Sequence, residues 1–179
     1  WEEYRATVDA RKRERFERDL ADIEAYYRGI EDKTGKIEEV EQQFEDAKRL
    51  MEDGDLASAL DVLGSIKGLV DIKYSEHVDS VLSRTYALLN DLRMSGVNVD
   101  RAEEKYNQAK MKYEEGDLDN ALMLANEAYR EASKLSQYRA KEIVSKARKR
   151  IAEAKHMGMR IEEFIPLLRQ AHEARIKKE

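Results

Sequence analysis

The residues of this chain that could do chemistry are few and scattered. His77, His156 and His172 lie on separate segments, and none has a second histidine or a cysteine at the spacing of metal ligands. The chain contains no cysteine, which excludes disulfides and thiolate metal sites. It also lacks a nucleophile elbow, a constellation of serine, histidine and acid, and a glycine-rich phosphate loop. We therefore predict no catalytic residue, no metal site and no cofactor, and we do not expect an enzyme.

A second group with chemical potential is an acidic turn that occurs twice. The stretch MEDGDLASAL at 51–60 returns as YEEGDLDNAL at 113–122. Its carboxylates could begin a calcium loop, but the remaining oxygen ligands are missing and an apolar helical pattern starts at once. A reversal between two helices accounts for the stretch better. In that reading Gly54 and Gly116 supply positive φ at a helix end, and Asp55 and Asp117 cap the next helix.

The third group is a basic stretch at 137–160. Its candidate anion-binding side chains are Arg139, Lys146, Arg148, Lys149, Arg150 and Lys155. Such a stretch could bind nucleic acid or an anionic membrane surface. The alternative is a solvated helix face that complements an acidic face elsewhere. We favour the alternative, because aromatic residues do not interleave with the basic ones as base stacking requires.

All these groups must be positioned by helices, because apolar residues recur along most of the chain at spacings of three and four. The pattern predicts short helices over 37–53, 99–115 and 161–178, and long ones over 56–95 and 118–157. A shift of 62 residues superposes the two acidic turns and nearly the whole pattern, which is typical of an array of repeated units.

A short helix between two reversals runs antiparallel to both long neighbours, and three helices are the minimum that closes a core. We therefore predict an all-α fold, an elongated tandem array of short, coiled-coil-like three-helix bundles linked by shared long helices with a 62-residue repeat. The expected units are two complete bundles over 14–75 and 76–137, an incomplete bundle over 138–179, and the end of an upstream repeat at 1–13.

Three finer expectations follow from the same pattern. Where a long helix passes from one bundle to the next it must change its buried face, so we expect a lapse in the apolar stripe at 74–77 and at 136–139. Two glycines favour a bend near 68–76. Asp100 and Glu103 have the spacing of a capping box, so we expect Asp100 to cap the short helix that follows.

Composition agrees with an extended helical chain. Charged residues make up 40% and hydrophobic residues 41% of the 179, and there is a single proline. The net charge of −5 argues against a general polyanion binder. No apolar run reaches the roughly 18 to 20 residues that span a bilayer, so we predict no transmembrane segment. Because the first residue is Trp1 rather than Met, we expect a fragment of a larger protein.

Chained three-helix bundles with shared helices resemble spectrin-type repeats, although the repeat here is far shorter. The pattern A-K-x-x-x-E-x-G-D-L-x-x-A-L at 47–60 and 109–122 is also similar to the hairpin of tetratricopeptide repeats and of helical repeats common in archaeal proteins. The 62-residue period argues against a tetratricopeptide superhelix. The spectrin-type resemblance implies a spacer or scaffold that sets distances and binds partners along its sides.

The last helical pair is expected to lack its third helix. Its apolar stripe, with Ile143, Ile151, Phe164 and Leu168, would then be exposed, and such stripes usually mark an interface. We predict a protein partner or self-association through these four residues. The function expected from the sequence is a structural spacer, scaffold or interaction rod, and the alternative is a nucleic-acid or membrane-surface binding arm at 137–160.

Overall fold

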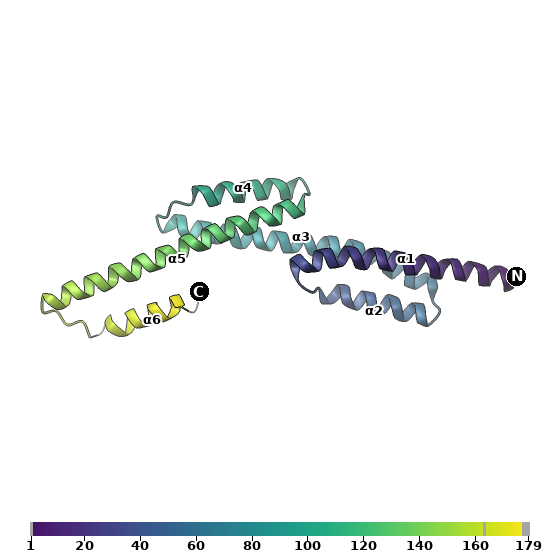
Figure 1. Ribbon diagram of the computed structural model, residues 1–179, viewed down its shortest axis with the longest axis horizontal. Coiled ribbons are helices and arrows are strands. Elements are labelled where there is room, and N and C mark those ends of the chain that lie inside the picture. The colour runs from purple at the N-terminus through teal and green to yellow at the C-terminus, as the bar shows by residue number, and fades with distance from the viewer. Residues whose placement is uncertain (1, 163, 177–179) are drawn as a thin grey trace. The chain divides into compact units, whose positions relative to one another are not determined.

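The computed structural model describes residues 2–162 and 164–176. In these two ranges the chain forms six α-helices and no strand, which confirms the all-α prediction. The helices are α1 (Glu2–Thr34), α2 (Glu38–Glu52), α3 (Leu56–Met94), α4 (Asp100–Glu114), α5 (Leu118–His156) and α6 (Phe164–Ile176) (Figure 1). None of them, over the described residues, is long and apolar enough to cross a membrane.

Long and short helices alternate along the chain. Helices α3 and α5 have 39 residues each, and α2 and α4 have 15 each. At 1.5 Å per residue, α3 and α5 are each roughly 60 Å long. Helix α6 begins at Phe164, so Pro166 lies in its first turn, where its missing N–H has no partner within the helix to lose.

The two acidic turns reverse the chain with the same backbone geometry. Gly54 has φ 84° and Gly116 has φ 79°, in the left-handed region that only glycine adopts without strain. The Asp55 N–H donates to the Leu50 carbonyl at 2.9 Å, and the equivalent bond closes the second turn, also at 2.9 Å. These are the bonds of a Schellman motif, which satisfies carbonyl groups at the end of the preceding helix.

The aspartates of the same turns cap the helices that follow. One carboxylate oxygen of Asp55 accepts from the Ser58 N–H at 3.2 Å, and one of Asp117 accepts from the Asn120 N–H at 3.3 Å. Hydrogen bonds from Ser58 lower the pKa of Asp55, and those from Asn120 lower the pKa of Asp117. Because both pKa values fall on folding, this stabilisation is present at neutral pH and is lost as the pH drops through the folded-state values.

Replacing a turn glycine and a helix glycine by alanine should change stability in opposite directions. Gly116→Ala puts a Cβ on a left-handed residue and should destabilise by about 1–2 kcal/mol. Gly68→Ala lies inside α3 and should stabilise by about 0.5–1 kcal/mol, because alanine is the better helix former. An added Cβ has no heavy atom within 4 Å at either position, so packing does not confuse the comparison. Urea unfolding midpoints measure both changes, and equal signs would contradict the assignment.

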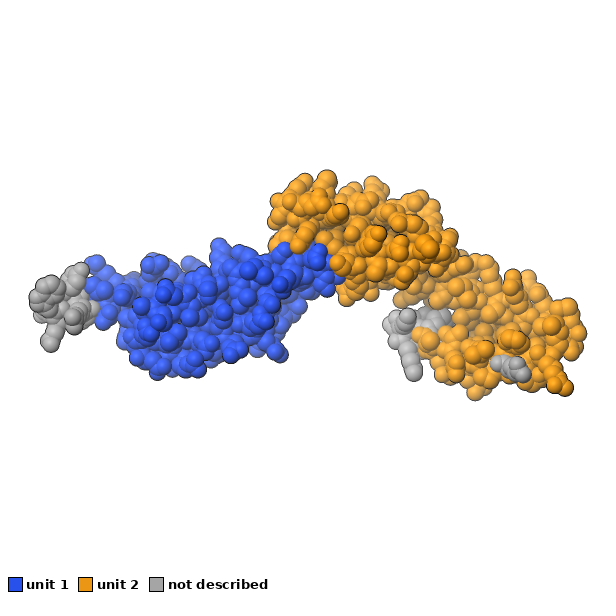
Figure 2. All heavy atoms as spheres, turned by 180° about the vertical axis from the view of Figure 1, so that it is seen from behind, with its two compact units in different colours: residues 1–80 blue, residues 81–179 orange. Residues whose placement is uncertain are grey.

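The chain divides into two compact units, residues 1–80 and 81–179 (Figure 2). Helix α3 contributes residues 56–80 to unit 1 and 81–94 to unit 2. It is continuous across this boundary.

In unit 1, helices α1, α2 and the first half of α3 bury apolar side chains against one another. The buried residues include Phe16, Tyr27 and Ile30 of α1, Val40, Phe44 and Ala47 of α2, and Leu63, Ile66, Val70 and Tyr74 of α3. The contacts that join these helices in pairs include the rings of Tyr27 and Phe44 at 5.9 Å, the Tyr26 hydroxyl with Asp71, and Lys73 Nζ with Glu39 Oε2 at 2.8 Å.

In unit 2, the end of α3, helix α4 and the first half of α5 share a core. It contains Leu89, Leu92, Val99, Ala102 and Ala132, with Leu88, Val97, Tyr106 and Leu135 packed against it. Thr85 is fully buried, and its hydroxyl donates to the Val81 carbonyl at 2.7 Å. The hydroxyl is therefore satisfied inside its own helix.

The predicted lapse in the apolar stripe of α3 is wrong. Tyr74 and Val78 are both buried, so the stripe runs through the segment where we expected a gap. Helix α3 changes its buried face through the spacing of its buried residues instead. Residues 70, 74, 78 and 82 are all buried and lie four positions apart. Each such step rotates the buried stripe by about 40°, whereas alternating steps of three and four nearly hold it in place.

The capping box at the start of α4 is also wrong. Helix α4 begins at Asp100, its N-cap is Val99, and that cap has no side-chain hydrogen bond. The Asp100 N–H instead donates to the Asn98 side-chain oxygen at 3.0 Å. Glu103 forms an ion pair with Arg93 of α3 rather than a bond at the start of its own helix. An interhelical partner has therefore replaced the local one.

Candidate functional site

The residues singled out for chemistry do not come together. No group of three or more histidine, aspartate or glutamate side chains in the described part of the chain could hold a metal ion. His77 lies half-buried within α3 and His156 is exposed at the end of α5. The side chain of His172 lies outside the described residues. In the acidic turns, Asp55 and Asp117 cap the helices that follow, and Glu115 pairs with Lys112 at 2.7 Å.

The basic stretch is divided between faces of α5. At about 100° per residue, Arg139, Lys146 and Arg150 lie on one face, while Arg148 and Lys155 lie on the opposite face. Lys149 points between these two sets. Glu142 further neutralises the first set, because its carboxylate pairs with Arg139 at 2.9 Å and with Lys146 at 2.6 Å. No single stripe of free cations follows the helix.

We therefore expect no specific binding of nucleic acid through α5. A site with six phosphate contacts would lose affinity by roughly 10³ between about 50 and 200 mM salt. Filter binding of the protein to DNA and to RNA over this salt range measures the effect. Weak retention that Arg148→Gln and Arg150→Gln reduce equally would reflect charge alone. Steep, salt-dependent affinity lost only with Arg150→Gln would contradict the expectation.

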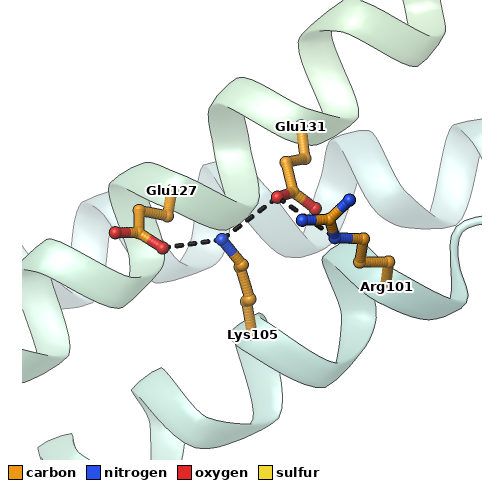
Figure 3. A network of polar contacts seen from close by, with 4 residues as sticks. All are labelled: Arg101, Lys105, Glu127 and Glu131. Carbon is orange, nitrogen blue, oxygen red and sulfur yellow. Dashed lines mark hydrogen bonds and ion pairs between the residues drawn. The ribbon is translucent and has the colours of Figure 1, made fainter.

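Helices α4 and α5 are joined by a polar network that the sequence pattern did not reveal (Figure 3). Lys105 Nζ lies 2.7 Å from Glu127 Oε2 and 3.0 Å from Glu131 Oε1, and Arg101 Nε lies 3.7 Å from the latter. Hydrogen bonds to Glu127 and Glu131 raise the pKa of Lys105, and the bond from Lys105 lowers the pKa of Glu127. Two cations face two carboxylates, so the network balances its own charge. We assign it a role in holding α4 on α5.

Beside this network lies a groove of about 600 Å³. Its lining consists of Asn98, Val99, Arg101, Ala102, Glu131, Lys134, Leu135 and Tyr138. Arg101 and Glu131 already belong to the network, and Tyr138 is exposed at the groove's edge. The groove has room for side chains of another protein, but nothing in it orients a reacting group.

Exposed apolar residues gather on the hairpin formed by the second half of α5 and α6. These two helices lie side by side (Figure 1). We call their apolar residues Ile143, Ile151, Phe164, Ile165, Leu167 and Leu168 the tail surface. Phe164 and Ile143 are each 52% exposed and Leu167 is 60% exposed, whereas Ile151 and Leu168 are half-buried.

A single neighbour cannot cover the apolar side of α6. At about 100° per residue, its four tail-surface residues span an arc of about 160°. Helix α5 meets only the middle of this arc, because Leu168 alone among them is half-buried. On α5 the half-buried residues facing the hairpin are Ala140, Val144, Ala147, Ile151 and Ala154. Ile143 lies beside that stripe, which is why it is exposed.

Positions 62 residues earlier show what a third helix does. Phe164 corresponds to Ala102 and Ile151 to Leu89, which are 1% and 2% exposed, and both belong to the core that also contains Ala132 of α5. In unit 2 the first half of α5 therefore covers the face that is open on the tail hairpin.

Comparison with protein-family models, curated proteins and solved structures gives no match. The sequence identified four of the six tail-surface residues. It missed Ile165 and Leu167, which lie on either side of the single stripe through Phe164 and Leu168, and their exposure on α6 reveals them.

Proposed function

We propose that the chain is a non-enzymatic spacer or scaffold that binds protein through the tail surface. In this proposal it is an elongated tandem array with a 62-residue repeat, and its three-helix bundles over 14–75 and 76–137 share the long helix α3. Residues 138–179 form the incomplete third bundle and 1–13 close an upstream one. The likeness to spectrin-type repeats is part of the same proposal.

The observation that carries the proposal is the continuity of α3. The helix runs from Leu56 to Met94 without interruption, and its buried residues face α1 and α2 in unit 1 and α4 and α5 in unit 2. A helix of roughly 60 Å shared by two cores favours an extended body over a globule. A spacer needs this geometry, because it must hold its ends at a fixed separation.

Small-angle X-ray scattering tests the proposed shape. A compact domain of 179 residues has a radius of gyration of about 16 Å, and we expect a value of at least about 25 Å from a rod containing helices of roughly 60 Å. The measurement uses the Phe164→Glu variant at several concentrations, so that contacts through the tail surface do not enlarge the value. A concentration-independent value near the compact limit would overturn the proposal.

A further inference from the structure

We propose that the tail surface binds an α-helix of another protein, one whose apolar side is flanked by glutamate or aspartate. The bound helix lies against α6 and the second half of α5, in the place that the first half of α5 takes in unit 2. The proposal rests on the proposed function, in which the tail surface is a protein interaction site, and adds the chemical class of the partner.

Positions 62 residues earlier show where such a helix packs. Ile143 is 52% exposed, whereas Val81 of α3, at the corresponding position, is 4% exposed in unit 2. Three residues after Val81, the guanidinium of Arg84 lies 4.6 Å from the centre of the Tyr129 ring of α5. This side of α3 therefore meets a third helix, and the matching side of α5, which carries Ile143 and Lys146, is open to one.

The open side of the hairpin is apolar at its centre. Ile143, Phe164 and Leu167 are each at least 52% exposed, so an apolar side chain packed on them is removed from water together with them. In unit 2 the covering helix buries apolar residues at spacings of three and four, which are Ala121, Leu122, Ala125, Ala128 and Ala132. A partner helix with this spacing over about three turns has the length that the surface requires.

Cations border this apolar side. Arg139, Lys146 and Arg150, which we call the basic edge, lie four residues before and three and seven residues after Ile143. At about 100° per residue, all three lie on the same side of Ile143 and within about 60° of it. Glu142 pairs with Arg139 and Lys146, so one carboxylate faces three cations and the edge stays positive. A bound helix with carboxylates on this flank gains favourable electrostatic contact.

The hairpin is the basic part of an otherwise acidic chain. Residues 138–179 hold 12 basic and 6 acidic residues, a net charge of +6, whereas residues 1–137 hold 21 basic and 32 acidic, a net charge of −11. Contact between the hairpins of two copies would bring like charges together. An acidic helix is attracted instead, which raises the association rate and disfavours the wrong pairing.

The first half of α5 from a second copy does not match this surface. Leu167 corresponds to Lys105 of α4, which pairs with Glu127 and Glu131 of the covering helix at 2.7 and 3.0 Å. A second copy of that helix would set both carboxylates against the apolar Leu167 instead of an ammonium group, which is unfavourable. The helix that matches is apolar where it faces α6 and acidic where it faces the basic edge.

Fluorescence anisotropy with labelled peptides of about 20 residues tests the chemistry of the partner. The probe is a designed helix with leucine at spacings of three and four, glutamate along one flank, and alanine and glutamine elsewhere. One comparison peptide has lysine in place of every glutamate, and the other has the residues of the probe in an order without an apolar side. We expect the full chain to bind the probe at least about tenfold more tightly than either comparison peptide. Salt at about 1 M should narrow the difference between the probe and the lysine peptide.

A charge on the tail surface should abolish this preference. Phe164→Glu should weaken binding of the probe by at least about tenfold. Met123→Glu is the matched control and should leave binding unchanged, because Met123 is also 52% exposed but lies on α5 outside the tail surface. Circular dichroism checks that both variants keep the helix content of the wild type.

Variants of the basic edge test the acidic flank without touching an apolar residue. Lys146→Gln combined with Arg150→Gln should weaken binding of the probe by about threefold to tenfold. Arg148→Gln combined with Lys155→Gln removes the same charge from the opposite face of α5 and should change binding by less than about twofold. Equal losses in the two pairs would contradict the role of the basic edge.

Three results would overturn the inference. One is a probe that binds no more tightly than the lysine peptide or the rearranged peptide. Another is a Phe164→Glu variant that binds the probe as tightly as the wild type does. The third is a wild type that dimerises in sedimentation velocity while Phe164→Glu does not, because a second copy then covers the tail surface.

The failure of this inference is distinguishable from the failure of the proposed function. If the lysine peptide binds most tightly, or if a second copy covers the tail surface, that surface still binds protein and only the class of partner is wrong. None of these results touches the radius of gyration of Phe164→Glu, which tests the spacer.

Discussion

Replacing Ser80 of α3 by proline should lower the free energy of unfolding by roughly 3 kcal/mol or more. Ser80 is exposed in the middle of α3, at the boundary between the two units, and no core contact depends on its side chain. Proline removes the N–H that bonds to the preceding turn, and its ring clashes with the carbonyl of that turn. The loss therefore measures how much the fold depends on an unbroken helix at this position.

The control for this change is Ser80→Ala, which keeps the backbone hydrogen bond and should shift stability by no more than about 0.5 kcal/mol. Far-ultraviolet circular dichroism during urea unfolding follows both variants. In the proline variant we also expect two separated transitions, because the units no longer share a continuous helix. A proline variant with the wild-type midpoint would mean that α3 is already interrupted near Ser80 in solution.

The helices and their reversals could be predicted because local sequence determines them. A glycine followed by an aspartate serves two local needs, a left-handed residue at one helix end and a cap at the next, and both occur at Gly54-Asp55 and Gly116-Asp117. Apolar spacing likewise identified the long helix that ends at Met94 and the short one that ends at Glu114 to within a residue. None of this required knowledge of distant contacts.

The errors arose where distant residues compete with near ones. The spacing of Asp100 and Glu103 indicated a capping box, but Arg93 lies within reach of Glu103 across the helix pair, and an ion pair replaced the local bond. The pairing of Lys105 with Glu127 has no periodic signature either, because the partners are 22 residues apart on different helices.

The tail surface was partly predictable, because it is the place where the 62-residue repeat lacks its third helix. Ile151 and Phe164 stand at positions that are buried one repeat earlier, so their sequence marks them as core residues without a complete core.

Shortening Ile66 to alanine should cost about 2–5 kcal/mol of stability, from lost apolar burial and the cavity left behind. Ile66 is 0% exposed in the middle of the unit 1 core. Ile72→Ala is a matched comparison, because Ile72 is the same residue type on the same helix but is 57% exposed. Alanine is the better helix former at both sites, so the second change should be neutral or slightly stabilising.

Thermal and urea unfolding of the two variants measure the difference directly, and intrinsic helix propensity cancels between them. The comparison tests which side of α3 faces α1 and α2, because six residues separate the sites and a rotated helix would exchange their burial. Equal losses at Ile66 and Ile72 would mean that α3 is buried on both sides. A larger loss at Ile72 would mean that the buried stripe of unit 1 lies on another face of α3.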